Sequence, residues 1–156
     1  VGFLTYGAVC DGSPAAFYEA LEKKSAGCIR GNISNASHLS QSIVWRSMQD
    51  EGHEWEKQAK FQILKNRALR VKEVLQDPRY AAAFEAYPFN AGYFMCIRLK
   101  TVDAEALRLH LLEHYGVGLI SIGRENLRLA FSCLEEEEVP VLFDSILQGV
   151  RDLESQ

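Results

Sequence analysis

One stretch of the chain, from Leu39 to Gln76, constrains the fold more than any other because it carries a single long helical pattern. Its apolar residues recur at near-helical spacing until Asp77-Pro78, where the proline ends the pattern. Gly52 predicts a kink or an interruption near the middle. A helix of this length is too long for a small domain, so the pattern indicates a bent or interrupted helix that bridges two regions.

The region before this stretch predicts one strand and one helix. Residues 1–6 are an apolar run that is typical of a short buried strand. Ser13 is a good N-cap for a helix over 14–21, with proline at its first position. We expect residues 25–27, Ser-Ala-Gly, to break this helix, and residues 28–35 to form a turn rich in small polar side chains.

The region after Pro78 predicts alternating strands and helices. In order, we expect a strand over 93–99, a helix that Asp103 caps and Gly116 ends, strands over 117–122 and 126–131, and a last helix that a Ser132–Glu135 capping box opens. Strand, helix, strand, strand, helix is an α+β arrangement, with helices packed on a small sheet.

The composition is that of an ordinary globular protein, with 47% hydrophobic and 24% charged residues. No apolar run reaches the roughly 18 residues that a membrane span needs. The net charge of −4 argues against a nucleic-acid partner, because phosphate binding needs clustered positive charge. The four cysteines, Cys10, Cys28, Cys96 and Cys133, form no CxxC pair, which favours reduced thiols and a cytoplasmic location.

The sequence His110-Leu-Leu-Glu-His114 matches the H-x-x-E-H pattern of a class of zinc peptidases. Histidines four residues apart share a helix face, so zinc binding is one interpretation. The other is an amphipathic helix near its C-terminus, where histidine suits the helix dipole. The second is favoured, because Gly116 ends the helix at once and no third ligand is evident; we expect no metal site.

Two arginines have open roles. Alternation places Leu127, Leu129 and Phe131 toward a core and Arg128 on the other face, where it is either solvated or available to grip a planar carboxylate. Arg30 precedes Ser34-Asn35, a combination that can bind an anion or simply form a turn.

Four segments, in order, resemble the C-terminal part of fold-type I aminotransferases, the class I/II enzymes that depend on pyridoxal phosphate. The run from Val1 to Gly7 is similar to the strand after the cofactor-binding lysine. Arg30-Gly-Asn-Ile-Ser34-Asn35 is similar to the R-x-x-x-S-N segment before the interdomain helix. Residues 90–94, Asn-Ala-Gly-Tyr-Phe, look like the G-G-x-F start of the small-domain sheet, and residues 127–132 look like the late strand that carries the substrate arginine.

This resemblance implies roles for four residues. Arg128 would bind the α-carboxylate of the amino-acid substrate, and Arg30 would reach the neighbouring subunit's site to bind a side-chain carboxylate. Ser34 and Asn35 would lie near the cofactor at that subunit boundary. The implied reaction moves an amino group between an amino acid and a 2-oxo acid, in a homodimer of aspartate or aromatic type.

The resemblance also implies that the Schiff-base lysine precedes Val1. We therefore expect no catalytic residue in this chain, no bound pyridoxal phosphate and no activity without the missing N-terminal part. Residues 1–50 would be a remnant of the large cofactor-binding domain with the start of the interdomain helix, and 51–156 the rest of that helix with the small domain. The alternative is a free-standing, non-enzymatic α+β module that binds a small carboxylate, although such a module has no reason to begin within a strand.

Overall fold

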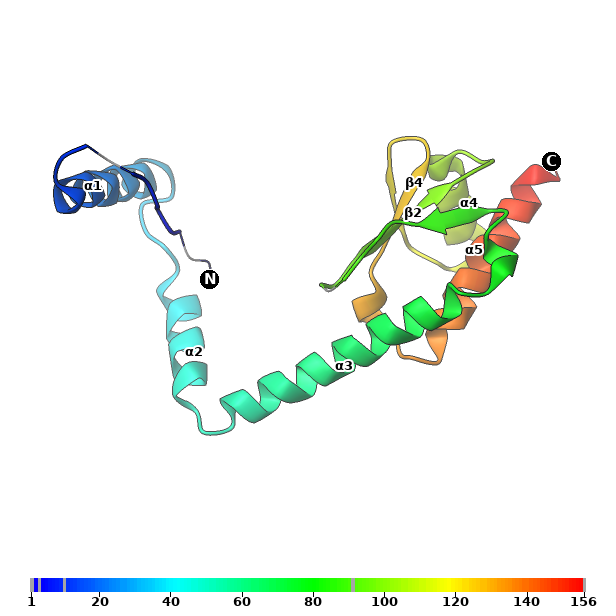
Figure 1. Ribbon diagram of the computed structural model, residues 1–156, viewed down its shortest axis with the longest axis horizontal. Helices are drawn as coiled ribbons and strands as arrows, with labels where there is room; N and C mark the ends of the chain where they lie inside the picture. Colours follow the sequence, from blue (N-terminus) through cyan, green and yellow to red (C-terminus); the bar gives the residue numbers. More distant parts are fainter. Residues whose placement is uncertain (1, 3, 10, 91, 156) are drawn as a thin grey trace. The chain divides into compact units, whose positions relative to one another are not determined.

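The computed structural model describes residues 2, 4–9, 11–90 and 92–155, so Val1, Phe3, Cys10, Ala91 and Gln156 lie outside the described part. The chain divides into two compact units, residues 1–55 and 56–156 (Figure 1). Each is described by itself below.

In the first unit, helix α1 (Pro14–Asn32) begins where the sequence predicts and ends eleven residues later than Leu21. The Ser13 side chain accepts a hydrogen bond from the Ala16 N–H at 3.5 Å. The expected break at 25–27 is wrong, because the Ser25 hydroxyl donates to the Leu21 carbonyl at 2.8 Å and so bonds to the helix instead of competing with it. The turn expected over 28–35 is therefore confined to the residues after Asn32.

The strand expected over residues 1–6 is also wrong for the residues that the structure describes, since 4–9 have no strand conformation. An apolar run becomes a strand only when a neighbour completes its hydrogen-bond ladder. No strand lies beside this segment among the described residues, and Leu4 is exposed.

The long helical stretch is interrupted, as predicted. Helix α2 (His38–Gln49) ends before Asp50, whose carboxylate accepts the Gly52 N–H at 2.7 Å, and α3 (His53–Val74) begins directly afterwards. Asp77 then caps a short 3₁₀ turn, η1 (Pro78–Tyr80), by accepting the Arg79 N–H at 2.9 Å.

The second unit contains a four-stranded antiparallel sheet in the order β1-β2-β4-β3. Its strands are β1 (Phe84–Ala86), β2 (Met95–Leu99), β3 (Ile120–Ile122) and β4 (Asn126–Leu129). Three of them are shorter versions of the predicted strands, whereas β1 was not predicted, because three residues carry too little alternation to show a period.

Helices α4 (Ala104–Tyr115) and α5 (Glu138–Glu154) pack together on one side of this sheet (Figure 1). As predicted, α4 is capped by Asp103 and ends at Gly116, whose φ of 66° is the left-handed conformation that glycine adopts easily. The expected Ser132–Glu135 capping box is wrong. Ser132 lies in a 3₁₀ turn, η2 (Phe131–Cys133), and the Glu135 N–H instead donates to the Glu138 carboxylate, at 2.9 Å.

The core lies between the sheet and these helices. The sheet contributes Met95, Ile97, Leu99, Leu127 and Leu129, and α5 contributes seven buried residues. The predicted α+β class is confirmed, with alternation along β2 and β4 deciding which side chains are buried. Among the described residues, no helix combines the length and the apolar character that crossing a membrane requires.

Candidate functional site

Arg128 lies on the sheet face that the helices leave uncovered. Strand alternation buries its neighbours Leu127 and Leu129 in the core and turns Arg128 the other way. In register, Arg128 lies between Cys96 of β2 and Ile120 of β3, so it occupies the middle of this face.

The guanidinium of Arg128 is held by an aromatic ring and by no carboxylate. Its central carbon lies 4.8 Å from the centroid of the Phe94 ring, a cation–π contact that orients the planar group. Among the described residues, no acidic side chain forms an ion pair with Arg128 and no acceptor takes its hydrogens. Its N–H donors are therefore available for a planar carboxylate.

Arg98 lies on the same face but, unlike Arg128, has an ion-pair partner. It pairs with Glu85 across the β1–β2 ladder, at 2.6 Å between Nη2 and Oε1. Two arginines on one sheet face thus have different roles: Arg98 ties two strands together, and Arg128 is open.

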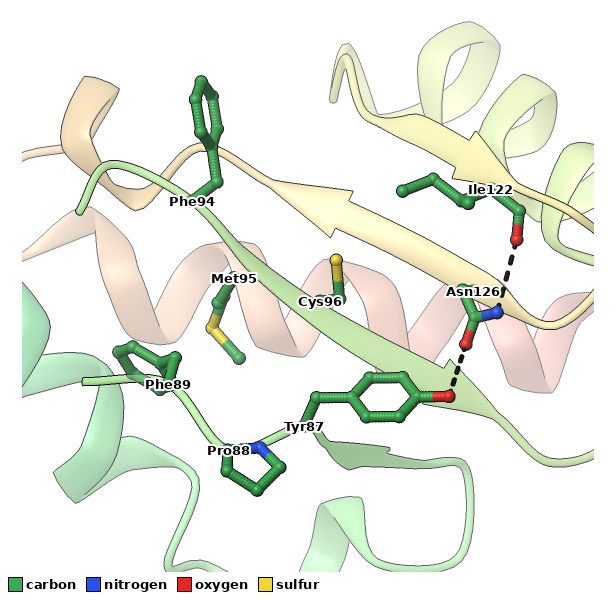
Figure 2. Close-up of a pocket in the computed structure, with 8 residues that line it drawn as sticks. All are labelled: Tyr87, Pro88, Phe89, Phe94, Met95, Cys96, Ile122 and Asn126. Atoms are coloured by element: carbon green, nitrogen blue, oxygen red, sulfur yellow. Dashed lines mark hydrogen bonds between the residues drawn. The ribbon is translucent and has the colours of Figure 1, made fainter. Parts of the chain in front are cut away.

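Phe94 and Cys96, the two neighbours of Arg128, also line a pocket of about 440 Å³. Figure 2 shows the residues that line it. Eight residues line it: Tyr87, Pro88, Phe89, Phe94, Met95, Cys96, Ile122 and Asn126. Its two polar side chains bond to each other, because the Tyr87 hydroxyl donates to Asn126 Oδ1 at 3.0 Å and the Asn126 amide donates to the Ile122 carbonyl at 3.3 Å. None of the eight is a lysine, histidine, aspartate, glutamate or arginine, so the lining carries no cationic side chain and no carboxylate.

Arg30, Ser34 and Asn35 lie together at the end of α1, in the first unit. Arg30 Nη1 donates to the Ser34 hydroxyl at 2.6 Å, and the Asn35 N–H donates to the Ile33 carbonyl at 2.8 Å. Ser34 has a φ of 68°, a left-handed conformation that is uncommon for a residue other than glycine. All three residues are exposed. Arg30 and Arg128 belong to different units.

The first histidine of the H-x-x-E-H pattern, His110, links helix α4 to helix α5. His110 Nε2 lies 3.0 Å from Asp152 Oδ2 of α5, and the Tyr115 hydroxyl donates to the same oxygen at 2.6 Å. These bonds, with the Tyr115 bond contributing most, lower the pKa of Asp152 to about 2. No group of three His, Cys, Asp or Glu side chains within the described ranges is placed to hold a metal ion.

Sequence reasoning missed most of the pocket wall. Tyr87 and Asn126 are 39 residues apart, and no spacing rule connects them. Phe94 carried a functional signal, because it belongs to the segment that resembles the start of the small-domain sheet, and Met95 and Cys96 lie in the strand predicted over 93–99.

No protein-family model matches this chain, and no curated protein matches it. Solved structures do. LysN, the α-aminoadipate aminotransferase of Thermus thermophilus, is 19% identical, with a TM-score of 0.69 over 92% of this chain and 37% of that one. The multiple substrate aminotransferase of Thermococcus profundus is 14% identical, with a TM-score of 0.73 over 87% of this chain and 36% of that one.

An aminotransferase of Anaerococcus prevotii is 23% identical, with a TM-score of 0.71 over 85% of this chain and 31% of that one. The chain has the fold of part of an aminotransferase. It spans about a third of the length of these solved chains. The predicted resemblance is thereby confirmed at the level of the fold.

Proposed function

We propose that this chain is the substrate-carboxylate-binding part of a pyridoxal-phosphate-dependent aminotransferase, and that Arg128 binds the α-carboxylate of the amino acid or 2-oxo acid. The observation that carries this proposal is the open guanidinium of Arg128 on an aminotransferase-like sheet. A bidentate contact there would fix the orientation of the substrate's Cα.

The solved relatives support the chemistry. The Thermus LysN structure contains N-(5'-phosphopyridoxyl)-L-leucine, and a Pyrococcus horikoshii kynurenine aminotransferase, similar over 90% of this chain, contains PMP. The cofactor supplies the electron sink for amino-group transfer when it is bound. The pocket lining includes no lysine that could attach the cofactor. We propose that the attachment lysine belongs to the rest of the enzyme, and we expect no transamination by this chain alone.

A partner for the first unit is part of this proposal. Helix α2 buries none of its residues, and its large apolar side chains Leu39, Ile43, Trp45 and Met48 are exposed. Exposed apolar side chains in this number favour association with more protein. The rest of the aminotransferase polypeptide and a second subunit of a cytoplasmic homodimer are the partners we propose.

We further propose that Arg30 binds the side-chain carboxylate of acidic substrates, with Ser34 and Asn35 at the same subunit boundary. The Ser34 hydroxyl already holds the Arg30 guanidinium in place. In the complete enzyme, Arg30→Ala should lower kcat/KM for acidic amino acids far more than for aromatic ones. Equal losses for both classes would contradict this role.

The Arg128 site can be tested in the chain itself. Pyruvate, the smallest 2-oxo acid with a carbon side chain, should shift the Arg128 Nε–H signal in ¹H–¹⁵N spectra of the labelled chain. Arg128→Gln should weaken pyruvate binding by about tenfold or more, because a charge-assisted bidentate pair is lost.

Arg98→Gln is the matched control, since Arg98 lies on the same face but already pairs with Glu85. It should leave the dissociation constant for pyruvate unchanged. Equal weakening by both substitutions would show only a general effect of positive charge, and would contradict the assignment of Arg128.

A further inference from the structure

Two of the residues that line the pocket are also direct neighbours of Arg128. The Phe94 ring lines the pocket and also carries the Arg128 guanidinium at 4.8 Å. Cys96 lines the pocket and is the direct cross-strand partner of Arg128 in the β2–β4 ladder. A ligand group bound to Arg128 would therefore lie next to Phe94 and Cys96, which also line the pocket.

We infer that this pocket receives an uncharged apolar or aromatic group from the same ligand whose carboxylate Arg128 binds. The ligand class is a monocarboxylate with a branched aliphatic or phenyl side chain. It would be one substrate of the amino-group transfer, and the acidic substrate proposed for Arg30 would be the other. This inference rests on the proposed carboxylate site at Arg128 and adds to it the class of substrate.

The lining explains why the group is apolar. Its aromatic and aliphatic side chains offer surface that gains free energy when a similar group covers it. The Tyr87 hydroxyl and the Asn126 amide use each other and the Ile122 carbonyl as partners. These bonds hold the two polar side chains of this wall toward each other and leave few donors and acceptors for a polar group on the ligand.

Charge excludes an acidic group for the same reason. No lining residue is cationic, the nearby Arg98 is paired with Glu85, and the Lys72 ammonium lies 5.3 Å from the centroid of the Phe89 ring, a lining residue that it already contacts. A second carboxylate in the pocket would lose water without gaining a cation. The volume, about 440 Å³, lies within the range of about 300–1,000 Å³ that is usual for small-molecule sites.

The test compares three carboxylates by ¹H–¹⁵N NMR titration of the whole chain: 3-phenylpropanoate, propanoate and glutarate. We expect 3-phenylpropanoate to bind about tenfold more tightly than propanoate, because its ring is partly removed from water. It should shift the amide signals of Phe94 and Cys96, and glutarate should gain nothing over propanoate.

Two neighbouring isoleucines of β3 provide matched variants. Ile122 and Ile120 are similarly exposed, at 45% and 49%, but only Ile122 lines the pocket. Ile122→Ala should reduce the preference for 3-phenylpropanoate several-fold, and Ile120→Ala should leave it unchanged.

The outcomes separate the two proposals. If the two monocarboxylates bind equally and Arg128→Gln abolishes both, the pocket inference is overturned and the Arg128 site stands. Tighter binding of glutarate than of 3-phenylpropanoate would also overturn the pocket inference and leave the Arg128 site standing. If none of the three binds, or if Arg128→Gln changes nothing, the carboxylate site itself is wrong and the pocket inference fails with it.

Discussion

Helix α5 of the second unit buries seven residues, whereas α1 and α2 of the first unit bury none. Both units contain large apolar side chains, so composition does not explain the difference. In the second unit a sheet and two helices supply surfaces that cover one another, and a connected core results. In the first unit Trp45 is 64% exposed and Leu39 71%. Apolar residues stabilise a fold only where the topology gives them a neighbour.

The largest effect should come from removing a central side chain of that core. Phe143 of α5 is fully buried and packs with Tyr80 and Phe84, its ring centroid 6.1 and 6.2 Å from theirs. Phe143→Ala should lower the free energy of unfolding of the second unit by about 3–5 kcal/mol, because it removes contacts and leaves a cavity. Urea unfolding followed by the near-ultraviolet signal measures it.

Val141 is the control on the same helix, since its side chain is exposed. Val141→Ala should change the free energy by about 0.5 kcal/mol or less. A loss below about 1 kcal/mol for Phe143→Ala would mean that the second unit has no tightly packed core, and the contrast between the units would fail.

Two helical glycines test the difference in packing between the two units, with smaller expected changes in stability. A Cβ at Gly149 of α5 would lie 2.9 Å from Leu111 Cδ2 and 3.0 Å from Leu107 Cδ1, whereas a Cβ at Gly27 of α1 meets nothing within 4 Å. Gly149→Ala should cost about 1 kcal/mol net, because overpacking at about 1–3 kcal/mol exceeds a gain of about 1 kcal/mol in helix propensity.

Gly27→Ala should instead stabilise α1, by up to about 1 kcal/mol. Slower amide exchange in α1 measures this gain, and thermal unfolding measures the loss at Gly149. The same sign for both substitutions would show that the two helices have similar surroundings, contrary to the structure.

The smallest expected effect is a change with pH in the stability that Asp152 contributes. The pKa of Asp152, about 2 in the folded chain, lies below the ordinary value of about 3.9, so its bonds stabilise the fold above about pH 4 and are lost as pH falls toward 2. The difference in thermal midpoint between the wild type and Asp152→Asn should therefore shrink between pH 5 and pH 2, taken as roughly the titration range.

The first unit supplies the comparison for this prediction. Glu19 pairs with Lys23 at 2.6 Å, but both side chains are exposed. Because exposed pairs contribute little, Glu19→Gln should leave the midpoint difference close to zero throughout this range. A difference for Asp152→Asn that stays constant with pH would show that its carboxylate has no special stabilisation in the fold.

Sequence signals that act between neighbouring residues predicted the structure better than those that depend on residues far apart in the chain. Asp103 is a local start signal and Gly116 a local stop signal, and the ends of α4 lie where they indicate. Ser25-Ala26-Gly27 has the same local character but did not end α1, because a side chain that can compete with a helix can also bond within it. The strand predicted over residues 1–6 is absent from the described residues 4–9 for a non-local reason, because a strand needs a partner strand.

The candidate site shows the same division. Alternation in residues 126–131 is enough to place Arg128 opposite the core, and the resemblance supplied its proposed role. The contact with Phe94 and the pocket beside it depend on strands far apart in the chain, so periodicity could not reveal them.

The sequence by itself determined the α+β class, the long interrupted helix, the inward face of β4 and the position of Arg128 on the opposite face. These properties follow from hydrophobic periodicity and capping, which act over a few residues. Only the tertiary structure decided that Arg98 is neutralised by Glu85, that Arg128 is open, and that His110 bonds to Asp152. The physical reason is that side-chain pairing depends on which strands and helices become neighbours, and that choice belongs to the whole fold.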